Sequence, residues 1–178
     1  MKLVNKLLLS AVFALSTLSA QAIDRTTIVD DANDVAPLMI GQKAPDVTLF
    51  SSEGEPLQLL EKVSEKPTVV LFYRGGWCPF CNAQLSQIQE IESDLTEMGY
   101  QLLAISPDTP SALKKTSSDK SLDYQLISDF QLQATRGFGL AFHIPKQYSD
   151  KIESKGSKTA RLAGDDKSTL PVPAVFIL

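Results

Sequence analysis

One stretch, residues 68–81, constrains this chain more than any other. It begins with a short run of β-branched and aromatic residues, 69–73, which predicts a buried strand. A glycine pair follows and permits a sharp turn. The apolar residues between positions 85 and 98 recur at helical spacing and predict one amphipathic helix. Cys78 and Cys81 therefore lie at a helix start, where free amides and the helix dipole favour the reactive thiolate.

The first 22 residues have the pattern of a secretory signal peptide. Lys2 and Lys6 precede a short apolar segment, and Ala20-Gln21-Ala22 matches the small-residue cleavage site. We expect cleavage after Ala22 and a mature protein that is periplasmic or secreted, without membrane contact. An uncleaved anchor helix is the alternative, but the apolar segment is short for a membrane span.

We expect a polar N-terminal tail over residues 23–40 and a single domain over residues 41–178. Strands alternate with helices, which predicts an α/β fold with a mixed central sheet, parallel neighbours and flanking helices. The domain opens with an N-terminal β-hairpin, and it is expected to be truncated because the chain stops inside an apolar strand. Strands are predicted at residues 47–50, 57–59, 69–73, 101–105, 126–127 and 174–178, helices at 110–118 and 130–142, and a solvated excursion at 148–169.

The two cysteines are best interpreted as a redox pair. A disulfide that closes so short a loop restricts the unfolded chain by only about 2 kcal/mol, so a purely structural bridge is poorly placed here. A structural zinc site is weaker still, because two thiolates and the single histidine, His143, fall short of four ligands. The net charge of −4 gives no electrostatic case for nucleic acid. We expect no metal and no cofactor.

Several motifs in a fixed order carry a resemblance to a known family. They are Gly-x-x-Ala-Pro-Asp from Gly41, a strand into Phe-Tyr-x-Gly-x-x-Cys-Pro, Ser-Pro-Asp from Ser106, and Ile-Ser-Asp from Ile127. This order resembles the alkyl hydroperoxide reductase/thiol-specific antioxidant (AhpC/TSA) family, the peroxiredoxins and their relatives, with a Cys-Pro-Phe-Cys centre. The resemblance implies a thioredoxin-like fold and an antioxidant oxidoreductase.

Two positions depart from the family pattern. The family site Pro-x-x-x-Thr/Ser-x-x-Cys places its peroxidatic cysteine on Cys81, its Thr on Cys78 and its Pro on Arg74. The family's peroxide-activating arginine falls on Pro173. Val-Pro-Ala before a strand instead resembles thioredoxin, so Pro173 is expected to be cis and to lie within reach of Cys78.

The resemblance implies two activities that share one redox pair. A peroxidase would reduce hydroperoxides through a sulfenic acid that condenses to a Cys78–Cys81 disulfide. A thioredoxin-like oxidoreductase would attack protein disulfides with Cys78 and resolve the product with Cys81. Either cycle needs an external thiol reductant, expected to be thioredoxin-like. We favour the hydroperoxide reaction, with the disulfide reaction as the alternative.

Two side chains are predicted to support the pair. Trp77 would form an apolar wall beside it or simply fill the core. Arg74 would hold a thiolate or a peroxide oxygen, although a solvated arginine is the simpler interpretation.

A non-enzymatic alternative uses His143. Secreted thioredoxin-like copper-delivery proteins bind metal with two cysteines and a distant histidine. Their motif resembles Cys-x-x-x-Cys-Pro and has one more residue between the thiols than this chain. One residue rotates the second sulfur about 100° around a helix, so this alternative is the least favoured.

Overall fold

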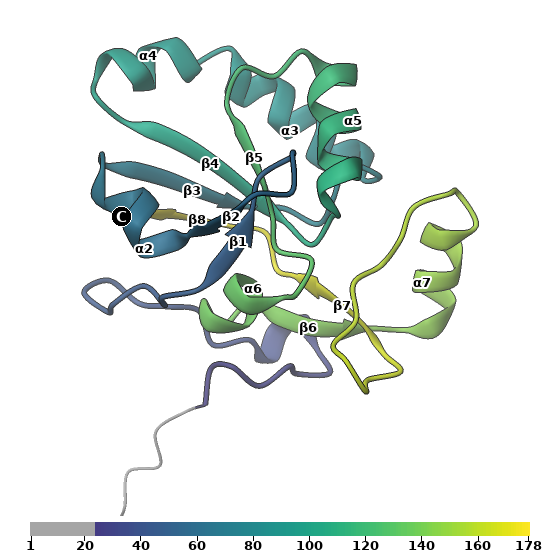
Figure 1. Cartoon of the computed structure of the whole chain (residues 1–178). Helices are drawn as coiled ribbons and strands as arrows, with labels where there is room; N and C mark the ends of the chain where they lie inside the picture. Colours follow the sequence, from purple (N-terminus) through teal and green to yellow (C-terminus); the bar gives the residue numbers. More distant parts are fainter. Residues whose placement is uncertain (1–23) are drawn as a thin grey trace, which may run out of the picture.

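The central sheet of the protein combines parallel and antiparallel strands, as predicted. The structure, a computed structural model, describes residues 24–178. Three adjacent strands are parallel, and antiparallel strands complete the sheet on both sides (Figure 1). In the order in which they pair, the strands are β2 (Pro56–Gln58), β1 (Thr48–Phe50), β5 (Gln125–Ser128), β4 (Gln101–Ser106), β3 (Thr68–Phe72) and β8 (Ala174–Ile177).

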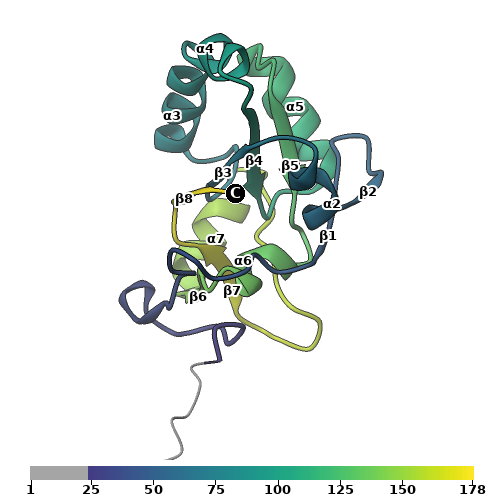
Figure 2. The ribbon, with the colours of Figure 1, turned by 90° about the vertical axis from the view of Figure 1, so that its left-hand side faces the viewer.

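The two faces of this sheet bury different helices. Alternate side chains of β3 point to opposite faces, so Leu71 packs with α3 (Pro79–Gln89) and α5 (Pro110–Lys120), and Phe72 packs with α2 (Leu59–Ser64) and α6 (Gln133–Gly137). The first of these clusters contains both cysteines. Figure 2 shows α3 and α5 above α6. The fold is therefore the expected α/β layered arrangement.

The predicted long helix after the cysteines is two helices in the structure. α3 ends at Gln89, and α4 spans Glu92–Glu97. The Gln89 side chain exchanges two hydrogen bonds with Asp123, which fixes the end of α3 against the chain before β5. Ile91 is 49% exposed, so the apolar spacing does not continue along one buried face. The prediction of one helix was wrong because the backbone turns at Glu90 and Ile91, whose N–H groups bond to the carbonyls three residues back.

The region after Phe130 also differs from the prediction of one broken helix. Only α6 is helical there, and the chain continues as β6 (Ala141–Ile144), which pairs antiparallel with β7 (Ser168–Pro171) in a second, two-stranded sheet. Gly139 makes the change of direction possible: its φ is +71°, and an added Cβ would lie 2.1 Å from the Ala36 carbonyl oxygen.

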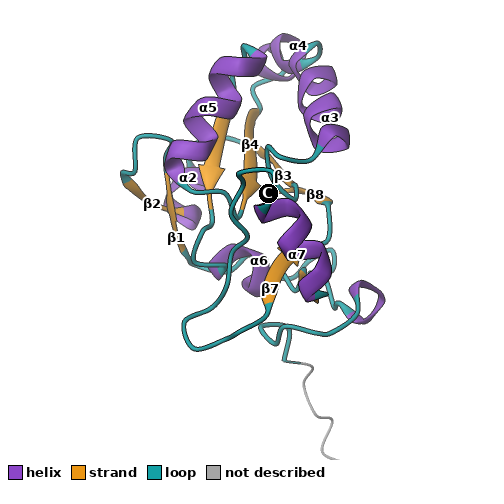
Figure 3. Ribbon diagram, turned by 90° about the vertical axis from the view of Figure 1, so that its right-hand side faces the viewer, coloured by secondary structure: helices purple, strands orange, loops and turns teal. Residues whose placement is uncertain are grey.

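Residues 148–169 were predicted to be a solvated excursion, which is right for the mostly exposed loop at residues 154–167 and wrong for the rest. This segment contains most of α7 (Lys146–Glu153) and enters β7. Ile152 is buried and packs with Ile144 and Leu170, and Trp77 lies against this small cluster. Figure 3 shows α7 below α3 and α5, near the middle of the molecule. The lysine-rich composition concealed a helix with one buried face.

The N-terminal segment from residue 24 to residue 40 follows the surface of the second sheet. It includes a short 3-10 helix, η1 (Ala32–Asp34), and Val29 forms a parallel bridge with Phe142. Leu38 donates its N–H to the Phe138 carbonyl. The predicted signal peptide over residues 1–22 lies outside the described residues. Among residues 24–178, no helix combines the length and apolar character needed to cross a bilayer.

Candidate active site

The turn between β3 and α3 is held in a strained, glycine-dependent shape. Gly75 has φ +140°, a value that side chains disfavour, and an added Cβ would lie 2.5 Å from the Trp77 indole nitrogen. At Gly76 an added Cβ would lie 2.1 Å from Thr116 Oγ1. The glycine pair therefore lets the chain pass close to α5 before it reaches the cysteines.

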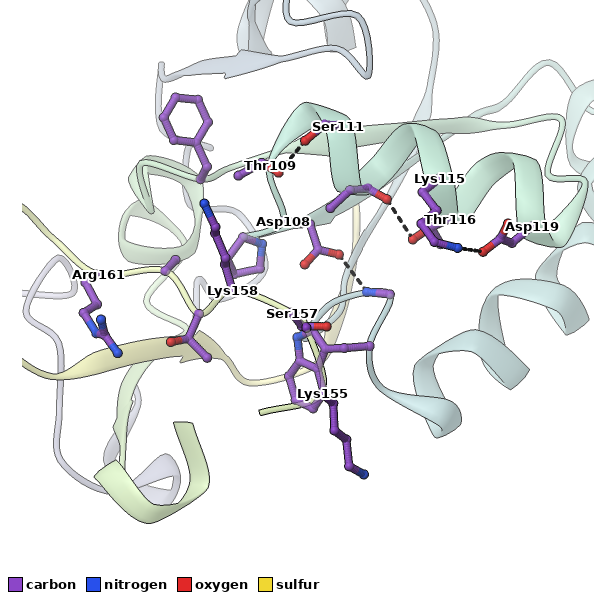
Figure 4. Close-up of a pocket in the computed structure, with 18 residues that line it drawn as sticks. Asp108, Thr109, Ser111, Lys115, Thr116, Asp119, Lys155, Ser157, Lys158 and Arg161 are labelled. Atoms are coloured by element: carbon purple, nitrogen blue, oxygen red, sulfur yellow. Dashed lines mark hydrogen bonds and ion pairs between the residues drawn. The ribbon is translucent and has the colours of Figure 1, made fainter. Parts of the chain in front are cut away.

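Two side chains fix Gly76 from opposite sides. Asp108 Oδ2 accepts the Gly76 N–H at 2.7 Å (Figure 4), and Asn82 Nδ2 donates to the Gly76 carbonyl at 2.8 Å. Asp108 is buried, and burial raises the pKa of its carboxyl. Sequence reasoning missed both residues. The Ser-Pro-Asp motif at the end of β4, beside β3, was the available signal for Asp108.

Cys78 is the N-cap residue of α3, and its sulfur receives two donors. The Cys81 N–H donates to Cys78 Sγ at 3.3 Å, and Arg74 Nη2 donates to it at 3.5 Å. Burial lowers the pKa of Arg74, but attraction to the two cysteine sulfurs outweighs this and raises it. A helix-terminal amide and a guanidinium aimed at one sulfur stabilise negative charge there. Arg74 thus contacts Cys78 and is not merely solvated.

Cys81 occupies the first turn of α3, behind Cys78. Both thiols are reduced and buried. Burial raises the pKa of Cys81, the hydrogen bond with Cys78 adds to the increase, and Arg74 opposes it. The two predicted redox residues are therefore neighbours in different environments, and Cys78 lines a pocket beside the start of α3.

That pocket has a volume of about 220 Å³ and opens onto Cys78. Trp77 lines the pocket and also packs against the core, and it meets the Tyr148 ring edge to face with centroids 6.2 Å apart. The opposite wall is α7, a contribution that sequence reasoning missed because it depends on the chain folding back. The lining residues are Arg74, Trp77, Cys78, Pro79, Phe80, Tyr148, Lys151, Ile152 and Lys155.

A larger cavity of about 720 Å³ lies on the other side of Trp77, between α5 and the chain after α7. Figure 4 shows its side chains of both charges, including Asp108, Asp119, Lys115 and Lys158. Lys115 is ion-paired with Asp119. Neither cysteine lines this cavity, whereas the smaller pocket leads to Cys78.

Pro173 does not have the predicted geometry. No peptide bond among the described residues is cis, so the Val172–Pro173 bond is trans. Pro173 is exposed in the link between β7 and β8, and it does not line the pocket at Cys78. The second sheet explains why Pro173 does not line this pocket. The Val172 N–H bonds to the Leu140 carbonyl, which directs the link between β7 and β8 toward β6.

His143 lies on β6 and contacts other partners. Its Nε2 is 3.7 Å from Asp165 Oδ2, and its Nδ1 is 3.4 Å from Thr169 Oγ1. Within residues 24–178, no group of three potential metal-binding side chains of His, Cys, Asp or Glu comes together. Nothing in this part of the chain supports the copper-binding alternative.

Known proteins show the family to which this chain belongs. A model described as the AhpC/TSA family matches residues 40–178, most of the chain. The chain belongs to the AhpC/TSA family. Among curated proteins of this family, the chain is 32% identical over 104 residues to a putative peroxiredoxin bcp of Haemophilus influenzae and 29% identical to peroxiredoxin Bcp of Escherichia coli K12. Each alignment spans 58% of this chain and 66% of the relative, slightly under two thirds of the relative's length.

Solved AhpC/TSA-type structures confirm the fold. Peroxidoxin BcpB from Mycobacterium tuberculosis superposes with a TM-score of 0.60 at 22% identity, covering 78% of this chain and 77% of that one. Peroxiredoxin Q from Xanthomonas campestris gives 0.58 at 17% identity, covering 78% of each chain. These matches establish a thioredoxin-like fold of the peroxiredoxin type for this AhpC/TSA chain.

Proposed function

We propose that this chain is a peroxiredoxin-like thiol peroxidase that reduces hydroperoxides through Cys78 and Cys81. The observation that carries the proposal is the environment of Cys78 Sγ, which faces a pocket and receives the Cys81 N–H and the Arg74 guanidinium. Family membership supports the same reaction class. Alignment to the family motif favours Cys81 as the first nucleophile, whereas this environment favours Cys78, and we propose Cys78.

The proposed reaction consumes one hydroperoxide and two external thiols. The Cys78 thiolate attacks the terminal peroxide oxygen, the S–O bond forms, and the O–O bond breaks as the alcohol leaves with a proton. Cys81 then loses its proton and attacks Cys78 Sγ, forming the disulfide and releasing water. Two external thiols reduce the disulfide and become a disulfide themselves. A thioredoxin-like reductant remains a prediction.

Arg74 has a role at both ends of the first step. Its guanidinium lies beside Cys78 Sγ, where it stabilises the attacking thiolate. The same positive charge lies near the oxygen that leaves with developing negative charge. Pro173 cannot supply the cation that the family pattern places at that position. Arg74, which replaces the family's proline, supplies a cation beside Cys78 Sγ instead.

Exchange with protein disulfides is the less favoured activity. Cys78 is only 2% exposed, and its sulfur is reached through a pocket of about 220 Å³. An in-line attack on a disulfide of a folded protein requires a more accessible sulfur. A hydroperoxide group is small enough for this pocket.

The competing activities can be separated by stopped-flow oxidation of the reduced protein. Trp77, the single tryptophan, lies beside the pair and provides the fluorescence signal. Hydrogen peroxide should oxidise the protein at least about a hundredfold faster than it oxidises free cysteine, given preorganised positive charge. A protein disulfide should react slowly. Rapid oxidation by the protein disulfide and peroxide reactivity equal to that of free cysteine would reverse the assignment.

We also propose that the chain works in the periplasm or outside the cell after cleavage following Ala22. The support is the pattern of Lys2, Lys6 and Ala20-Gln21-Ala22. N-terminal sequencing of the full chain recovered after expression in a bacterium should begin at Ile23. An intact N-terminus in the cytosolic fraction would contradict the proposal.

A further inference from the structure

The pocket at Cys78 has a charge opposite to that of the protein as a whole. The chain carries a net charge of −4. The charged side chains that line this pocket are Arg74, Lys151 and Lys155, and no Asp or Glu is among its described lining residues. A cationic pocket at Cys78 in an acidic protein indicates that the pocket prefers negatively charged reactants.

The position of the lysines follows from the periodicity of α7. Tyr148, Lys151, Ile152 and Lys155 are spaced by three or four residues and share one face of the helix and its last turn. The Lys155 N–H bonds to the Ile152 carbonyl, which extends this turn. Figure 4 shows the Lys155 side chain extending away from Asp108. The face that meets Cys78 thus alternates apolar and cationic groups.

The neighbouring carboxylates are engaged elsewhere. Asp150 pairs with Lys146 at 2.8 Å, and Glu153 pairs with Arg161 at 2.8 Å. Neither Lys151 nor Lys155 forms an ion pair within the described part of the chain. Their charges are therefore available to a ligand that enters the pocket.

We infer that this pocket binds small molecules that carry a carboxylate, with their apolar part between Trp77 and Ile152 and their reactive group at Cys78 Sγ. The inference rests on the proposed function, because such a molecule is either the hydroperoxide that oxidises Cys78 or the thiol that reduces the Cys78–Cys81 disulfide. The pocket volume admits a short aliphatic body beside the reactive group. Lys151 and Lys155 pair with the carboxylate at the rim.

Both candidate reactants give balanced steps at Cys78. A carboxylate-bearing hydroperoxide follows the oxidation described above. A carboxylate-bearing thiol, as its thiolate, attacks Cys78 Sγ in the disulfide, and Cys81 leaves as a thiolate and takes a proton. A second thiol attacks the mixed disulfide, which yields the reduced Cys78 and the disulfide of the two small thiols.

The most direct probe is a pair of alkylating reagents that differ in charge and assume no redox activity. In Cys81→Ser protein, the Cys78 thiolate attacks the methylene carbon of iodoacetate or iodoacetamide and displaces iodide. The rate constant for iodoacetate is divided by the rate constant for iodoacetamide, and this ratio is normalised to the ratio for the same protein unfolded in urea. The normalised ratio should be about ten in the folded state. It should fall as salt is added, since screening weakens the attraction.

Charge reversals assign the effect to α7. Lys151→Glu with Lys155→Glu should return the normalised ratio to one or below, and Lys151→Arg with Lys155→Arg should preserve it. Lys146→Glu with Lys120→Glu reverses two exposed lysines outside the pocket, so it is the matched control for net charge and should retain the wild-type ratio. A ratio that is equal in folded and unfolded protein, or unchanged by the pocket reversals, would overturn the inference.

Two further arms identify the reactant. In the first arm, reduced wild-type protein is mixed with tert-butyl hydroperoxide or with an analogue that carries one carboxylate. In the second arm, diamide-oxidised protein is mixed with 2-mercaptoethanol or 3-mercaptopropionate, and each rate constant is corrected for the thiolate fraction of the reagent. A preference for the anion that Lys151→Glu with Lys155→Glu removes should appear in at least one arm. Its absence from both would overturn the inference. If no hydroperoxide reacts, the proposed function fails, while the alkylation and thiol arms still decide the inference.

Discussion

At the scale of single residues, the site depends on the different hydrogen-bond donors and burial of two neighbouring thiols. Cys78 Sγ receives an amide and a guanidinium, whereas burial raises the pKa of Cys81. The two donors at Cys78 Sγ and the raised pKa of Cys81 suit the proposed order of steps, because Cys81 is needed only after the sulfenic acid has formed.

Replacing Arg74 tests this arrangement. Arg74→Met removes the charge beside Cys78 Sγ while keeping an unbranched chain, and it should slow oxidation by hydrogen peroxide about tenfold to a hundredfold. Arg74→Lys retains the charge but not the planar pair of donors, so its rate of oxidation should lie between those of Arg74→Met and the wild-type protein. Stopped-flow fluorescence gives the rate constants, and thermal unfolding checks that both variants fold. Unchanged oxidation in Arg74→Met would show that the guanidinium has no role.

At the scale of elements, the cysteine helix is positioned by the hydrogen bonds to Gly76. Asp108→Ala should leave the Gly76 N–H without a partner and cost about 1–3 kcal/mol in the free energy of unfolding. Asp108→Asn, whose amide oxygen can accept that N–H, should cost less. Urea unfolding measures both, and Asp119→Ala on the exposed side of α5 is the control. Equal stability of Asp108→Ala and wild-type protein would contradict this account of the turn.

Asp129 gives a pH-dependent test at the start of α6. Its carboxylate accepts the Ala134 N–H at 3.0 Å and the Thr135 N–H at 2.7 Å, yet burial raises its pKa to about 6. Because this pKa lies above the unfolded value of 3.8, the stabilising contribution is present below pH 3.8 and lost as pH rises through about 6.

The free energy of unfolding of wild-type protein, relative to Asp129→Asn, should therefore fall by up to about 3 kcal/mol between pH 4 and pH 7. Urea unfolding at a series of pH values measures it. A difference that stays constant or rises over this range would refute the titration of Asp129.

The elements also show what sequence patterns can and cannot predict. The run before Gly75 forms β3, and the cysteines begin α3, because both depend on local sequence. The paths of β6 and α7 were not predicted, since β6 is defined by its pairing with β7 and the buried face of α7 is short. The site followed the same division. Cys78 and Cys81 were proposed from their spacing, and Trp77 and Arg74 from their places beside the pair. Asp108 was missed because its contact with Gly76 is distant in sequence, and Asn82 because its bond to the Gly76 carbonyl depends on the shape of the turn.

At the scale of the whole molecule, an AhpC/TSA fold carries a Cys-Pro-Phe-Cys helix start with its cation at Arg74. The main sheet brings the ends of β3 and β4 together, which places Asp108 under the Gly75-Gly76 turn. The second sheet brings α7 across to close the pocket over Cys78. The reactive sulfur is therefore sheltered from large partners and open to small ones.

The most direct test of this account is to identify the residue that a hydroperoxide oxidises first. Reduced Cys81→Ser and Cys78→Ser proteins are each treated with one equivalent of hydrogen peroxide and a dimedone-type probe, and the labelled peptide is identified by mass spectrometry. The account predicts rapid peroxide consumption and a labelled Cys78 in Cys81→Ser, with little consumption or label in Cys78→Ser. A labelled Cys81 in Cys78→Ser, with Cys81→Ser inert to peroxide, would contradict it.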